Sequence, residues 1–170
     1  MHARLTRRLR VHCYDVLAPE RPERFGTVIA SRVVRDCESL QTRLAAITRS
    51  TDVEASHAAR IAAKRLRYII EPVSDVVSGG DAIIVTLKTL QDALGELRDV
   101  HVVSNALATL DAGAAARPAL LRLAHRVHHR GALAYETIER DWRNGAASAF
   151  FDAVRTLAAV IERQASARGG

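Results

Sequence analysis

One stretch of the chain, residues 56–68, places several anion-binding side chains at helical spacing. It holds one histidine, three permanent cations and one phenol: His57, Arg60, Lys64, Arg67 and Tyr68. At about 100° per residue, these side chains share one face of an α-helix whose other face is apolar. Glu71 is the nearest acidic residue on that face, so the cations have little counter-charge of their own. Such a row suits an extended polyanion or several anions in line, although many charged helix faces are simply solvated.

A second row of side chains, with the same offsets along a helix, follows in the predicted helix 82–110. Its members are Lys88, Gln91, Asp92, Gly95, Arg98 and Asp99. We expect the two cations to add to the anion-binding surface and the two aspartates to orient them. A glycine within a helix costs about 1 kcal/mol relative to alanine. Gly95 therefore indicates the close approach of a neighbouring helix or a ligand, unless it is an incidental glycine.

Two more predicted helices carry basic side chains opposite an apolar face. These side chains are Arg32 and Arg35 in the helix 23–49, and Arg122, His125, Arg126 and His129 in the helix 118–143. They would extend the binding surface if their helices turn these faces toward it. His125 and His129 also have the i, i+4 spacing of metal ligands, but arginines flank them and no glutamate follows in the manner of zinc proteases. We therefore expect surface or groove histidines here and no metal site.

The composition predicts one all-α domain over residues 1–170. Aromatic residues make up only 4% of the chain, and glycine and proline are sparse, which favours packed helices over a β-sandwich. We expect an antiparallel bundle of about six helices. Five of these helices are expected at residues 3–17, 23–49, 82–110, 118–143 and 147–165. The sixth begins after a capping box of Thr51 and Glu54 and is expected to be kinked or broken at Pro72. The core side of the helix 82–110 is expected at Ile83, Leu87, Leu90, Leu94, Leu97 and Val100.

The chain is basic, with a formal net charge of +6, and Lys64 and Lys88 are the only lysines among its 25 basic residues. Arginine suits bidentate phosphate contacts, although GC-rich bacterial genomes also favour it by default. No apolar run is long enough to span a membrane, and no signal peptide is recognisable. Two cysteines, Cys13 and Cys37, do not make a disulfide framework. We therefore expect a cytoplasmic protein with a polyanionic partner.

Two segments resemble the paired motifs of the CHAD domain family, the conserved histidine α-helical domain. His57–Tyr68 reads H-x-x-R-x-x-x-K-R-L-R-Y, and Leu87–Asp99 reads L-x-x-L-Q-D-x-L-G-x-x-R-D. Members of this family are all-helical and bind inorganic polyphosphate through histidine, lysine and arginine side chains, and they are not established as catalytic. The resemblance implies that Arg65, inside the first motif, joins the binding residues.

The resemblance runs from about residue 20 to about residue 145, with the motifs within about 54–105. The full family domain has two pseudo-symmetric halves, and this chain resembles mainly the second, with residues 1–20 similar to the tail of a first half. Either the chain is a shortened member, or two chains pair as a homodimer that restores the two-fold arrangement.

These features together predict non-catalytic binding of inorganic polyphosphate in a basic helical groove, without a cofactor or a metal. An alternative is a helical protein that binds RNA or DNA, because the charge argument serves it equally well. Few aromatic side chains are available to stack on bases, which weighs against that alternative. A metal-dependent phosphohydrolase is a third alternative, for which only Asp92 and Asp99 are placed even roughly.

Overall fold

The computed structural model describes residues 22–111, 113–143 and 147–167. These residues form five α-helices and no strand: α2 (Pro22–Ala45), α3 (Val53–Ile70), α4 (Gly80–Thr109), α5 (Arg117–Trp142) and α6 (Ser148–Ala167). The prediction of an all-α bundle is confirmed, and the helix bounds lie within a few residues of those expected. The helix expected at residues 3–17 lies outside the described residues.

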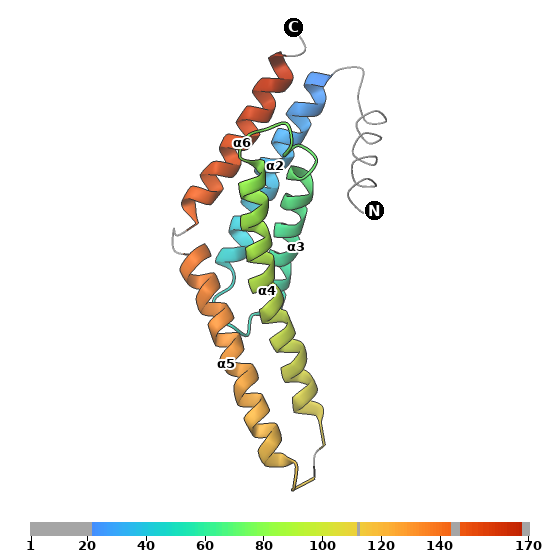
Figure 1. Ribbon diagram of the computed structural model, residues 1–170, viewed down its shortest axis with the longest axis vertical. Helices are drawn as coiled ribbons and strands as arrows, with labels where there is room; N and C mark the ends of the chain where they lie inside the picture. Colours follow the sequence, from blue (N-terminus) through green and yellow to red (C-terminus); the bar gives the residue numbers. More distant parts are fainter. Residues whose placement is uncertain (1–21, 112, 144–146, 168–170) are drawn as a thin grey trace.

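The helices are antiparallel neighbours, and α3 lies between α2 and α4 (Figure 1). Since α6 runs back along α2, these four helices form a bundle. α5 packs against α4. The second half of α4 and the first half of α5 project beyond the other helices as a pair (Figure 1). We call this projection, residues 102–111 and 113–133, the arm.

The bundle is held together by a core of aliphatic side chains. All six positions expected on the core side of α4 are buried, and Leu87, Leu90 and Leu97 are completely so. Leu40 of α2, Leu66 of α3 and Val154 of α6 join them in one hydrophobic cluster. Burial of such side chains is the main stabilising contribution to a fold of this kind. Within the described ranges, no single helix is both long enough and apolar enough to cross a bilayer.

The connection between α3 and α4 shows the expected break near Pro72. α3 ends at Ile70, a series of turns follows, and Gly79 precedes α4 with a φ of 91°. Only glycine adopts this left-handed conformation without a steric penalty. The prediction of Thr51 as the N-cap of α3 is wrong, because the N-cap residue is Asp52.

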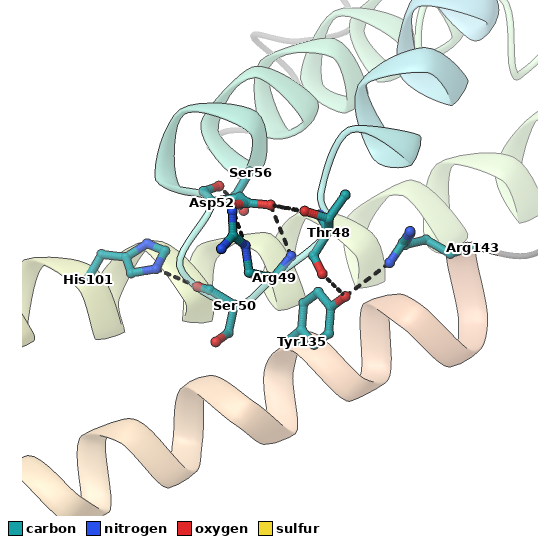
Figure 2. A network of polar contacts seen from close by, with 8 residues as sticks. All are labelled: Thr48, Arg49, Ser50, Asp52, Ser56, His101, Tyr135 and Arg143. Atoms are coloured by element: carbon teal, nitrogen blue, oxygen red, sulfur yellow. Dashed lines mark hydrogen bonds and ion pairs between the residues drawn. The ribbon is translucent and has the colours of Figure 1, made fainter.

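The carboxylate of Asp52 turns back onto the α2–α3 loop instead of capping the helix (Figure 2). Its Oδ2 atom accepts hydrogen bonds from the amide of Thr48 at 2.8 Å, the hydroxyl of Thr48 at 2.8 Å and the amide of Arg49 at 2.9 Å. The two donors of Thr48 contribute most to lowering the pKa of Asp52 below its ordinary value. The loop is therefore stabilised by an ionised aspartate.

Two neighbouring helices also hold the α2–α3 loop (Figure 2). Nε2 of His101 in α4 donates to the carbonyl of Ser50 at 2.6 Å, and the hydroxyl of Tyr135 in α5 donates to the carbonyl of Thr48 at 2.6 Å. Arg143 donates to the same tyrosine oxygen at 3.0 Å. These bonds fix the start of α3 relative to α4 and α5, and so they position the row of cations that follows.

Candidate functional site

Arg60 of α3 reaches across to α4. Its Nη1 atom donates a hydrogen bond to the carbonyl oxygen of Gln91. The same nitrogen lies 3.0 Å from the place that a Cβ atom would take at Gly95. A side chain at position 95 would therefore press on the guanidinium. Of the two interpretations of Gly95, the structure shows the close approach of a neighbouring helix.

The contact between Arg60 and Gly95 joins the two rows of the sequence along the line where α3 and α4 pack. We call this line the seam. Its α3 side holds His57, Arg60, Lys64, Arg67 and Tyr68. Its α4 side holds Lys88, Gln91, Asp92, Arg98 and Asp99, which follow the same side of the helix as Gly95 by the 3.6-residue repeat. The structure therefore brings together the residues that the sequence placed in two separate rows.

Tyr68 organises two of the cations on the α3 side. Its ring lies 5.5 Å from Nζ of Lys64 and 5.1 Å from Cζ of Arg67, within the range of cation–π attraction. Arg67 also approaches Glu71, with 3.6 Å between Nε and Oε1, and its side chain is only 18% exposed. Arg67 is thus partly neutralised, whereas Lys64 is exposed and keeps its full charge.

Most other cations of the seam have no counter-ion among the described residues. Lys64, Lys88 and Arg98 are exposed, and each lacks a hydrogen bond or ion pair within the described ranges. Asp92 and Asp99 are exposed as well and pair with neither Lys88 nor Arg98 in that part of the chain. Elsewhere arginines do find acids: Arg32 pairs with Asp36, and Arg155 with Asp152. Cations outnumber acidic residues along the seam, and Lys64, Lys88 and Arg98 have no ion pair among the described residues, so the seam carries a net positive charge.

Two side-chain donors on the buried side of the seam have no hydrogen-bond partner among the described residues. One is Nε2 of Gln91, a residue that is 9% exposed. The other is Nε of Arg67, which lies 3.6 Å from the Glu71 carboxylate, beyond hydrogen-bond distance. Buried polar atoms in proteins nearly always have partners, so both donors are available to an acceptor from outside the bundle.

Other predicted site residues lie away from the seam. Arg65 is exposed on the flank of α3 that faces away from Arg60, about 140° around the helix. Arg32 and Arg35 belong to α2, which packs on the other side of α3, and Arg32 is paired with Asp36. The structure therefore does not bring the α2 arginines together with the seam.

The basic residues of α5 are also separate from the seam. Arg130 pairs with Glu96 of α4, and Gly131 lies against Val100, so this side of α5 faces α4. Arg122, His125, Arg126 and His129 occupy the opposite, exposed side. Within the described residues, no three histidine, cysteine or acidic side chains gather in a way that could hold a metal ion.

The CHAD domain model matches residues 1–108, which is more than half of the chain and includes both motifs and both sides of the seam. This match begins earlier than the expected start near residue 20 and ends before α5. No curated protein and no solved structure matches the chain. The chain belongs to the CHAD domain family.

Proposed function

We propose that this protein binds inorganic polyphosphate along the seam without catalysing a reaction. The CHAD family is associated with polyphosphate binding. The observation that carries the proposal is the contact of Arg60 with Gly95, because it aligns the cations of two helices along one line. Lys64, Lys88 and Arg98 lack counter-ions among the described residues, which favours an external polyanion over internal ion pairs.

Each part of the seam has a role in this proposal. The hydrogen bond from Arg60 to Gln91 uses one of its five N–H groups and leaves the others for phosphoryl oxygens. Lys64, Lys88 and Arg98 bind further phosphates. Arg65 lies on the flank of α3 that faces away from Arg60 and adds positive charge without direct contact. The row from His57 to Tyr68 is about 16 Å long at 1.5 Å per residue, so it contacts several consecutive phosphates.

Asp92 and Asp99 have a supporting role in the proposal. They lie beside Lys88 and Arg98 without pairing with them in the described part of the chain, and in this proposal they take no part in catalysis. His57 and Tyr68 donate hydrogen bonds to the ligand at the two ends of the α3 row.

The proposal includes a cytoplasmic location and a homodimer. Leu110 and Leu121 in the arm are 58% and 66% exposed and line one hollow, where a second copy of the chain would find an apolar contact. Sedimentation equilibrium tests this part. We expect a mass that rises to that of two chains with concentration, and a monomer at every concentration would contradict it.

A titration of labelled long-chain polyphosphate at two salt concentrations tests the function. The Lys64→Gln/Lys88→Gln variant should bind more weakly, and the slope of log affinity against log salt should fall by about 1 for each lost phosphate contact. The Arg43→Gln/Arg163→Gln variant removes the same charge from exposed positions outside the seam and should bind nearly as the unmodified protein does. Equal losses in both variants would contradict the proposal. So would release of phosphate over time, in samples with and without divalent cations.

A further inference from the structure

The arm carries a basic surface of its own. No acidic residue lies between Asp111 and Glu136, while this interval holds four arginines and three histidines. Four of these, Arg122, His125, Arg126 and His129, share one exposed side of α5, and we call them the arm cluster. Within the described ranges none of the four forms a hydrogen bond or an ion pair. The cluster is therefore a second concentration of uncompensated charge.

The arm cluster lies on a different side of α4 from the seam. Gly95 of α4 meets Arg60 of α3, whereas the next residue, Glu96, pairs with Arg130 of α5. Consecutive residues point about 100° apart around a helix, so α3 and α5 meet different sides of α4. The cluster then faces away from α4 altogether, on the part of the molecule that projects beyond the bundle (Figure 1). A ligand on the seam does not cover it.

The side chains around the cluster indicate which polyanion it takes. Leu121, Leu123 and Leu133 are exposed, but they lie on three different sides of α5 and form no continuous apolar face for a lipid surface. No aromatic residue occurs between Asp111 and Tyr135, so the cluster has nothing on which bases could stack. What it offers is a line of phosphate-binding side chains at intervals of one turn.

We propose that the arm cluster is a second binding surface for inorganic polyphosphate, independent of the seam. The class of ligand rests on the proposed function, and the separate location rests on the packing of α4. Two surfaces in one molecule make the protein bivalent toward long chains. Binding at one surface raises the effective concentration of the same chain at the other, or it joins two chains together.

The two surfaces differ in their histidines. The arm cluster contains His125 and His129, whereas His57 is the single histidine of the seam. α4 is the helix that packs against this half of α5, and it supplies Glu96, which pairs with Arg130. Asp111, which follows α4, lines a hollow with Arg117 and His128. Loss of His125 and His129 should therefore weaken binding at the arm and leave the seam unchanged.

Calorimetry with a polyphosphate too short to reach both surfaces tests the proposal on the full chain. The unmodified protein should bind at two sites, and Arg122→Gln/Arg126→Gln and Lys64→Gln/Lys88→Gln should each bind at one. The variant His125→Gln/His129→Gln should keep both sites and bind more weakly at the arm alone. Long-chain polyphosphate should raise the light scattering of the unmodified protein through cross-linking, and less so for either two-residue charge variant.

The outcomes separate this proposal from the proposed function. One site in the unmodified protein, abolished by the seam variant alone, would overturn the arm as a binding surface and leave the seam intact. One site in the unmodified protein, abolished by the arm variant alone, would overturn the seam as a binding surface and leave the arm intact. Equal displacement of polyphosphate from the arm by single-stranded RNA would overturn the assignment of its ligand. Circular dichroism of each variant should match that of the unmodified protein, since all substituted side chains are exposed.

Discussion

The Nη1 atom of Arg60 lies 3.0 Å from the place that a Cβ atom would take at Gly95. This separation is shorter than an ordinary van der Waals contact with carbon, so the guanidinium occupies space that is open only because position 95 has no side chain. The hydrogen bond to the carbonyl of Gln91 holds it there. One glycine thus allows an arginine of one helix to become part of the surface of the next.

The free energy of unfolding of Gly95→Ala should reveal this contact. Alanine gains about 1 kcal/mol of helix propensity over glycine, but its Cβ would push Arg60 from its position. We expect the full gain only in an Arg60→Ala background and a smaller gain, or a loss, in the unmodified background. Urea denaturation of the four proteins in this cycle measures the difference. Equal gains in both backgrounds would show that Arg60 does not rest on position 95.

Gly131 is expected to be less tolerant of alanine, because a side chain of α4 lies directly against it. A Cβ atom there would lie 2.9 Å from Cγ1 of Val100, a short and stiff side chain. Overpacking of this kind costs about 1–3 kcal/mol, so Gly131→Ala should lower the thermal midpoint. Gly113, which has open space around it, provides the matched control, and Gly113→Ala should shift stability by less than about 0.5 kcal/mol. A stabilised Gly131→Ala protein would contradict the packing described here.

Tyr135→Phe should loosen the loop that precedes α3. It removes the hydroxyl that donates to Thr48 and accepts from Arg143. A net loss of about 0.5–1.5 kcal/mol per hydrogen bond is typical. Tyr68→Phe is the matched control, since the Tyr68 hydroxyl has no hydrogen bond among the described residues and the side chain is half exposed. Equal free energies of unfolding for the two variants in urea would show that the hydrogen bonds of the Tyr135 hydroxyl do not stabilise the protein.

Cys37 should make the protein sensitive to alkaline pH. Burial raises the pKa of its thiol from 9.0 to about 11, against the opposing effect of Arg155. Since the unfolded chain loses this proton first, the contribution to stability is complete below about pH 9 and is lost as the pH rises toward 11. The slope is at most roughly 1.4 kcal/mol per pH unit. Stability curves of Cys37→Ala and its parent, both in a Cys13→Ser background, should diverge in that window; parallel curves would exclude this effect.

The helices and their core sides could be predicted from the sequence because both depend on local periodicity. Leu87, Leu90 and Leu97 recur at helical spacing, and all three are buried. The break near Pro72 follows from the chemistry of proline, which cannot continue the hydrogen-bond ladder. The cap of α3 could not be predicted in the same way. Thr51 and Asp52 are both good caps, and the loop fold, with Thr48 as partner of Asp52, decides between them.

The side chains of the candidate site could be predicted from the sequence, but the helices that become neighbours could not. Periodicity places Arg60 and Gly95 on the polar sides of their own helices, but it does not say which helices become neighbours. The α3–α4 packing brings these two sides together, whereas the basic side of α5, represented by Arg126, faces away from α4. The partial neutralisation of Arg67 by Glu71 could have been foreseen from their i, i+4 spacing.

Competition between polyphosphate and nucleic acid tests the central claim most directly. Labelled polyphosphate bound to the full protein would be challenged with single-stranded RNA and with duplex DNA at equal phosphate concentration, and Arg60→Gln/Lys64→Gln would serve as the comparison. We predict that polyphosphate stays bound in the unmodified protein and that its affinity falls in the variant. Displacement by an equal amount of RNA, or an unchanged affinity of the variant, would contradict a seam that binds polyphosphate.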